Sequence, residues 1–447
     1  MNANRGYAQE TRLNDFAPQA RAQALRELVA ETARAKSPRP PVGDAVNLHM
    51  HTFFSYSAEG RSPTALAWLA RQQGFWAAGI VDFDVLDGVE EFLEACDTLG
   101  VRGTAGIETR AFLPAFADRE INSPGEPGVC YHMGVGFVSG MTPDCDAGIL
   151  AGMRRQAEER NREMVRRLNA HLAIVAVDYD ADVLPLTPSG NATERHILAA
   201  YLQVMARAVD PVRLWAAKLG LPAEQVAAQL NDGPKFQNLV RTRWMKRGCV
   251  AYLPPGPQTF PGVEEVNRLT LACRAIPCVA WLNGASAGEQ ALEELLALHV
   301  RLGAAALNII PDRNWNIADA DTRRAAVQNL HRAAAMACAL DLPLLAGTEM
   351  NSPGQKVVDD FDIPELAPLK PDFRDGAAFL YGHTVLQRAR ALGYSSEWAQ
   401  SHFPARRERN AFYRQIGERT PPGHDAILRL RALPANPSPD KVLSWIN

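Results

Sequence analysis

Two histidines stand two positions apart in the segment VNLHMHTFFSYS, which runs from Val46 to Ser57. Because residues i and i+2 of a β-strand point to the same face, His49 and His51 would present their imidazoles side by side. Such pairs are a common way to hold a transition metal. Random placement of 10 histidines in 447 residues gives roughly 0.2 such pairs. The pair alone therefore leaves two interpretations open, metal ligands or strand histidines satisfied by polar neighbours.

Further polar side chains stand where predicted strands end. They are Asp82, Glu108, His132 and Glu349. In an α/β barrel, the loops after the carboxyl ends of the strands build the active site. Each residue taken singly has a structural explanation, such as helix capping, an ion pair or core packing. The ordered series predicts an active site at this end of a barrel.

The elements that would position these residues follow from alternating patterns. Short apolar runs alternate with helical patterns, which predicts βα units around a sheet, either a barrel with one unit missing or distorted or a doubly wound sheet. The predicted strands cover residues 45–51, 77–83, 103–109, 131–138, 277–283, 304–310 and 342–350. The predicted helices between them begin near Ser62, Gly88, Gly148, Gly262, Gly288 and Thr322.

We divide the chain into a barrel and three additions. Residues 1–42 are an N-terminal helical arm, in which Pro18 to Ala35 carries the helical pattern before a proline-rich stop. The metal-binding barrel covers residues 43–352, and residues 176–250 form a helical cap inserted in it. Residues 353–447 are a C-terminal extension that we expect to pack on the barrel.

Composition excludes several classes of protein. The 47 Lys+Arg and 50 Asp+Glu give a formal charge of -3, so we expect no nucleic-acid polymer as partner. No apolar run approaches the roughly 20 residues of a membrane helix, and the N-terminus lacks a secretory signal pattern. Seven cysteines without a CxxC pair favour reduced thiols. These features predict a soluble, cytoplasmic protein.

The ordered motifs resemble the PHP family, named for polymerase and histidinol phosphatase domains. HMHTFFSYSAEG is similar to its first motif, GIVDFDVLDG to its second, GIE at Glu108 to its third and GTEMN at Glu349 to its last. Residues 154–161 and 191–197 also look like the phosphoesterase branch of the family. The resemblance spans residues 45–352 and implies a distorted (β/α)7 barrel of PHP type.

Three departures from the family pattern bear on the metal. Phe83, Trp281 and Asn351 stand where the family carries histidine. The resemblance then implies one metal site with a full ligand set, a weaker second site and a lost third. The full set is His49, His51, Glu108 and Glu349, and the second site would use His132, Glu108 and Asn351, with His132 also a candidate catalytic residue. Imidazole and carboxylate ligands suit Mn, Fe or Zn.

The substrate contacts are predicted from charge and position. Arg195 and His196 in the cap are candidates for an anionic group, because guanidinium matches phosphate or carboxylate bidentately. Lys356 could reach the mouth of the site, and Asp82 and Asn351 complete the predicted substrate-binding set.

We therefore expect a metal-dependent hydrolase, a phosphoesterase acting on a small phosphorylated metabolite or nucleotide. One alternative is a PHP-derived metal enzyme of another type, a carbohydrate hydrolase, lyase or isomerase, which the Phe83 and Trp281 replacements favour. The other is a catalytically silent binding protein. The expected partner is a small anionic molecule, and the oligomeric state stays open.

Overall fold

A computed structural model describes residues 9–35, 40–143, 146–173, 175–230 and 232–446. Seven strands form one sheet in the order in which they follow along the chain. The strands are β1 (Val46–Met50), β2 (Ala77–Phe83), β3 (Arg102–Phe112), β4 (Val129–Val135), β5 (Ile276–Trp281), β6 (Ala306–Ile309) and β7 (Leu344–Ala346). All neighbours pair in parallel except β4, which runs antiparallel to both β3 and β5.

The sheet curls until its first and last strands meet. Just beyond β7, Glu349 forms a parallel bridge with Met50 at the end of β1. The amide of His51 donates to the Glu349 carbonyl (2.8 Å), and the amide of Glu349 donates to the His49 carbonyl (2.7 Å). Glu349 has a φ of 65° and Met350 one of 55°, which is left-handed backbone that non-glycine residues rarely adopt. The turn therefore places Glu349 beside both histidines.

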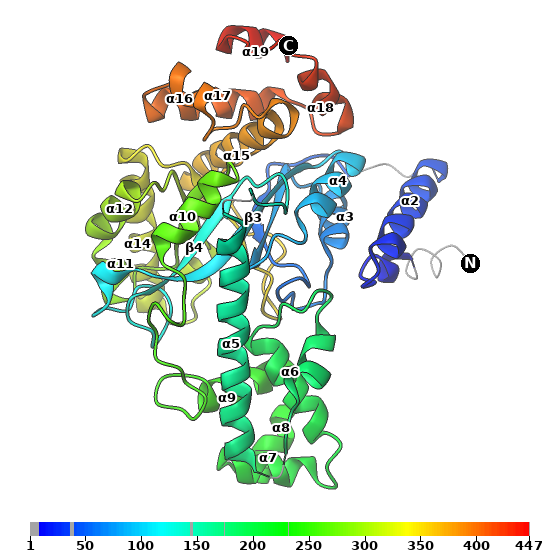
Figure 1. Cartoon of the computed structure of the whole chain (residues 1–447), viewed down its shortest axis with the longest axis vertical. Helices are drawn as coiled ribbons and strands as arrows, with labels where there is room; N and C mark the ends of the chain where they lie inside the picture. Colours follow the sequence, from blue (N-terminus) through cyan, green and yellow to red (C-terminus); the bar gives the residue numbers. More distant parts are fainter. Residues whose placement is uncertain (1–8, 36–39, 144–145, 174, 231, 447) are drawn as a thin grey trace.

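Helices cover the outside of the barrel in the spaces between strands (Figure 1). Their start signals are local: Ser62 caps one helix by accepting from the Ala65 amide, and Asp319 caps another by accepting from the Thr322 amide. The covering helices are α3 (Pro63–Gln72), α4 (Val89–Leu99), α10 (Val263–Ala272), α11 (Ala287–Gln290), α12 (Leu292–Arg301), α13 (Asp312–Trp315) and α14 (Ala320–Ala339).

The C-terminal extension covers one end of the barrel. Helix α15 (Lys370–Arg390) packs against β1, β2, β3 and β7. A Cβ atom on Gly376 of α15 would lie 1.8 Å from the Leu344 carbonyl oxygen, so only glycine allows this close approach. The helices α16 (Glu397–His402), α17 (Arg406–Arg419), α18 (His424–Arg431) and α19 (Pro439–Trp445) follow. They lie on the side of the barrel opposite the cap (Figure 1).

The cap is a helical unit with its own hydrophobic core. Helix α5 (Ala147–Leu172) runs from the barrel down the length of the cap (Figure 1). It is joined there by α6 (Glu194–Met205), α7 (Pro211–Leu219), α8 (Ala223–Leu230) and α9 (Gly233–Trp244). The buried side chains of Trp215, Phe236 and Trp244 pack together at its centre. At the other end of the chain, the arm folds as α2 (Pro18–Arg34). None of the helices described is both long and apolar enough to cross a membrane.

The prediction of a distorted seven-stranded α/β barrel is confirmed, and the doubly wound alternative is excluded by the meeting of β1 and β7. The strand boundaries differ from those expected by a few residues at most ends. The antiparallel direction of β4 was not expected from the alternating pattern. It places the first residues of β4, and not the last, at the carboxyl end of the barrel.

Candidate functional site

Three side chains converge at the carboxyl end of the barrel, two from β1 and the loop after it and one from β3. The Nε2 atoms of His49 and His51 lie 3.3 Å apart. The Oε2 atom of Glu108 lies 3.3 Å from the first and 3.1 Å from the second. All three residues are buried, with at most 2% of their surface exposed. The i and i+2 spacing thus places both imidazoles against one carboxylate.

Hydrogen bonds behind the imidazoles determine which ring nitrogens face this cluster. His49 Nδ1 lies 2.8 Å from the amide oxygen of Asn308 on β6, so Nδ1 carries the proton. His51 Nδ1 lies 3.2 Å from the Ser55 hydroxyl. That hydroxyl donates its one proton to Asp82 Oδ1 (2.6 Å) and must accept from His51. Both rings therefore turn their Nε2 atoms toward Glu108, where these atoms can bind a proton or a metal ion.

Three acceptors that face one another in a buried space need a cation between them. A proton partly fills this need. Burial alone would lower the pKa of His49, but the charge of Glu108 outweighs it and raises that pKa above its usual value. Burial opposes ionisation of Glu108, but His49 and His51 lower the pKa of its carboxyl to about 2. Two imidazole nitrogens and a carboxylate with held tautomers are a donor set that fits a divalent transition metal.

Glu349 lies beside the cluster with its carboxylate turned to another partner. Its Oε2 accepts from Arg313 Nε (3.1 Å) and Nη2 (2.5 Å) of α13, and from Gln355 Nε2 (3.0 Å). The main-chain bonds to His49 and His51 keep the residue at the site. The structure brings together three of the four ligands expected for the first metal site. The fourth, Glu349, lies next to them, with its carboxylate bound by Arg313.

His132 lies away from the cluster. Its Nε2 is 2.6 Å from Asn267 Oδ1 on α10, and its ring stacks on His299 of α12 at 5.3 Å. The register explains the difference from expectation: Glu108 pairs with Met133 and Thr109 with His132 across the antiparallel β3–β4 pair. Residues directly opposite share a face, and successive residues alternate. His132 therefore points outward to the helices, and the predicted second metal site lacks its histidine.

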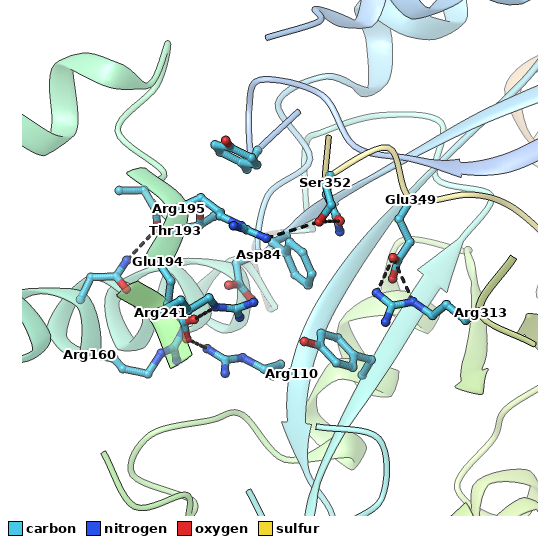
Figure 2. A pocket seen from close by; sticks show the side chains of 16 residues that line it. Asp84, Arg110, Arg160, Thr193, Glu194, Arg195, Arg241, Arg313, Glu349 and Ser352 are labelled. Carbon is cyan, nitrogen blue, oxygen red and sulfur yellow. Dashed lines mark hydrogen bonds and ion pairs between the residues drawn. The ribbon is translucent and has the colours of Figure 1, made fainter. Parts of the chain in front are cut away.

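A cavity of about 150 Å³ opens between the cap and the barrel (Figure 2). His49, His51 and Glu108 are not among its lining residues, and it adjoins the cluster through Phe83 and Glu349. Its walls carry five arginines and three carboxylates, a surplus of two positive charges. The arginines are Arg110, Arg160, Arg195, Arg241 and Arg313, and the carboxylates are Asp84, Glu194 and Glu349. Three aromatic residues also line it, Tyr56, Phe83 and Tyr131. Phe83 stacks on His51 at 4.7 Å.

Some of this positive charge is already paired and some is not. Glu194 accepts from Arg241 Nε (2.7 Å) and Arg110 Nη2 (3.4 Å). Two guanidinium atoms without a hydrogen-bond partner, Arg195 Nη1 and Arg160 Nε, are buried at the cavity. Unpaired buried N–H groups cost free energy until a ligand accepts from them. The charges and open donors suit an anion.

The predicted substrate-binding residues divide into two groups. Arg195 and Asn351 line the cavity. His196 is instead buried at the start of α6, where its Nδ1 accepts from the Thr193 amide (3.1 Å). Lys356 Nζ lies over the Trp315 ring, 4.0 Å from its centroid. Asp82 accepts hydrogen bonds from Thr52 and Ser55. These last three do not line the cavity.

Sequence patterns did not identify several residues of the site. Arg110 stands two positions after Glu108 on β3, so strand periodicity alone predicts that the two side chains lie on the same face. Asn308 stands on β6, where a polar residue in the apolar run ALNI was an available signal. Arg313 and Arg241 lie on helices in segments without a motif, and only tertiary packing brings them to the cavity.

Two solved structures are similar to this chain over much of its length. An amidohydrolase from Chromobacterium violaceum, solved with bound sulfate and no metal, has 16% identity and a TM-score of 0.49, covering 74% of this chain and 96% of that chain. A candidate metal-dependent phosphoesterase from Bifidobacterium adolescentis has 18% identity and a TM-score of 0.47, covering 74% and 97%. Likeness at this level carries no conclusion about this chain. No family model and no curated protein sequence matches the chain.

Proposed function

We propose that this protein is a metal-dependent hydrolase that acts on a small phosphate ester. One observation carries the proposal: the Nε2 atoms of two imidazoles and a carboxylate oxygen converge within 3.3 Å beside a cavity with surplus arginine. His49, His51 and Glu108 would hold the ion, and Glu349 lies beside them. The PHP resemblance of the motifs is in line with this assignment.

The protein side chains would perform the remaining tasks. A bound divalent ion would supply Lewis acidity toward a phosphoryl oxygen and acidify water. Arg195 and Arg160, which line the cavity, would bind the phosphate and orient it. The half-buried walls exclude much of the solvent, which strengthens these charge interactions. Ser55, Asp82 and Asn308 hold the tautomers of the two histidines.

The phosphate ester is favoured over other anions by the shape of the donors. Planar guanidinium groups match the oxygen atoms of phosphate in pairs, and five of them surround one small cavity. A long polymer would meet no extended basic surface, given the formal charge of -3.

The test combines metal content with turnover. Full-length protein purified without chelator should carry close to one equivalent of Mn, Fe or Zn and hydrolyse members of a panel of small phosphomonoesters. Glu108→Gln, which keeps the shape and removes the charge, should lose the metal and the turnover together. The matched control is Glu293→Gln on the exposed face of α12. Metal below about a tenth of an equivalent in the wild type would overturn the proposal.

A second candidate, a metal enzyme that does not act on phosphate, is favoured by Phe83. Its ring stacks on His51, and its centroid lies 6.1 Å from the centroid of the Tyr131 ring. Part of the cavity wall is therefore aromatic and suited to stacking on a sugar. Full metal content with no turnover of any phosphate ester, but with turnover of a neutral glycoside, would favour this candidate. Full metal with no turnover at all would favour a binding protein.

A further inference from the structure

Asp84 differs from the other carboxylates that line the cavity. Glu194 is bound by Arg110 and Arg241, and Glu349 is bound by Arg313. Within the described part of the chain, no Lys, Arg or His nitrogen lies within ion-pair distance of Asp84. Its one side-chain partner is the Thr109 hydroxyl, which donates to Oδ1 at 2.5 Å. Figure 2 shows its carboxylate among the arginines of the cavity without a line to any of them.

Arg160, which also lines the cavity, is held in place by other residues. Arg160 donates through Nη1 to the Thr259 carbonyl (2.8 Å), and its guanidinium lies over the Phe260 ring at 4.8 Å. The Asp84 backbone is fixed as well, because its amide donates to the Glu108 carbonyl and its φ is 60°. Left-handed backbone is uncommon at a non-glycine residue and is concentrated at functional sites. The chain thus presents a carboxylate to the cavity in a fixed position.

We infer that Asp84 binds a hydroxyl group on the alcohol part of the substrate, so that the preferred ligand is a phosphate ester of a polyhydroxylated compound. A carboxylate accepts up to about four hydrogen bonds, and only one side-chain donor satisfies Asp84 here. Ligand entry displaces the water that serves the other lone pairs, which costs free energy unless the ligand brings a donor. A purely apolar ester leaves that cost uncompensated.

The same charge separates the two ends of the ligand. A phosphate dianion next to Asp84 would meet like charge, whereas at Arg195, near which Arg241 adds a second positive charge, it would meet opposite charge. The phosphate therefore goes to the arginines, and the hydroxyl goes to Asp84. This inference rests on the proposed function for the phosphate, and it adds which alcohols the site accepts.

The test is a binding titration on the full-length chain in the presence of a chelator, so that no turnover interferes. The ligands are inorganic phosphate, propyl phosphate and glycerol 1-phosphate, where the last two differ by the hydroxyl groups. We expect the wild type to bind glycerol 1-phosphate about tenfold more tightly than propyl phosphate, the effect of one hydrogen bond to a charged group. Equal affinity for the two esters would overturn the inference.

The variants use residues that tolerate left-handed backbone, so that loss of folding is avoided. Asp84→Gly should reduce the preference to less than about twofold and bind inorganic phosphate at least as tightly as the wild type, because a negative charge is gone. Asp84→Asn, which keeps one acceptor, should be intermediate. The control is Asp87→Asn, the same charge change on a residue outside the cavity lining that pairs with Arg154. A preference retained in Asp84→Gly would overturn the inference.

Failure of this inference and failure of the proposed function give different results. A hydroxyl preference that depends on Asp84 in a protein without metal or turnover would keep the inference and remove the hydrolase. Turnover of phosphate esters without such a preference would keep the hydrolase and remove the inference.

Discussion

The guanidinium of Arg313 binds the carboxylate of Glu349, with Nη2 2.5 Å and Nε 3.1 Å from Oε2. The charge of Glu349 is therefore compensated before any ion arrives. Glu349 also raises the pKa of Arg313 above its usual value, with burial acting in the opposite direction. A metal at the His49 cluster and Arg313 would compete for the same carboxylate.

Removing this competitor should strengthen metal binding. We expect Arg313→Gln to raise the affinity for Co²⁺ or Mn²⁺ by up to about fivefold, the range for a partly exposed ion pair, and to weaken phosphate binding. Calorimetric titration of each ligand measures both effects. Arg324→Gln, which removes an exposed pair with Asp321 on α14, is the control. A fall in metal affinity in Arg313→Gln would contradict the competition.

The support behind His51 should contribute to metal affinity without contacting the ion. Ser55→Ala or Asp82→Asn frees the His51 ring to change tautomer, and we expect metal affinity to fall about 10- to 100-fold. The visible spectrum of bound Co²⁺ should change, because the ring orientation changes. Ser57→Ala, a buried serine without a side-chain hydrogen bond to another described residue, is the matched control. An unchanged spectrum and an unchanged affinity would show that the hydrogen bonds of Ser55 and Asp82 do not contribute to metal binding.

His132 was expected to bind a metal, but in the structure it contacts Asn267 and His299. His132→Leu should leave metal affinity within about twofold of the wild type, and lower the free energy of unfolding by about 1–3 kcal/mol, because Asn267 loses its partner. His51→Leu should abolish metal binding. Thermal unfolding and metal titration of both variants provide the measurement, and loss of metal binding in His132→Leu would restore His132 as a ligand.

Acid should destabilise the protein through the same buried pair. Burial lowers the pKa of His132 to about 4 and that of His299 to about 3, from the usual 6.5. Below pH 6.5 the unfolded chain takes up protons that the folded chain refuses, so stability falls as pH decreases from 6.5 to about 3. Each proton adds a slope of about 1.4 kcal/mol per pH unit.

The measurement for this effect is urea unfolding at several pH values between 7 and 4. His299→Leu removes one of these protons and should reduce the slope. The slope should not vanish, because burial also lowers the pKa values of His196 and His383 to about 4. His171 is exposed near the C-terminal end of α5. His171→Leu, away from the buried pair of His132 and His299, should keep the wild-type slope. A slope in His299→Leu equal to that of the wild type would contradict the assignment.

Much of the barrel was accessible from sequence because its signals are local. Runs such as Ala77–Phe83 are apolar, bounded by turn residues and followed by helix caps, and the structure places strands there. The His49 and His51 pair was found for the same reason, since strand alternation fixes both side chains on one face.

What the sequence did not reveal depends on register and tertiary packing. The direction of β4 is set by its pairing with β3 and β5, and this pairing turns His132 outward. Arg313 reaches Glu349 from a four-residue helix, and Arg241 reaches Glu194 from the cap. No spacing along the chain encodes these contacts, because the first needs the closed barrel and the second needs the packing of the cap helices α6 and α9.

The meeting of the first and last strands also sets the order in which the site is assembled. Asn47 donates to the Thr348 hydroxyl at 2.7 Å across 301 positions of the chain, beside the bonds between Glu349 and the two histidines. A ribosome makes the histidines early, but the seam that orders them exists only after β7 has emerged. Metal uptake would then report that the barrel has closed, and a nascent chain that stops before β7 would remain without it.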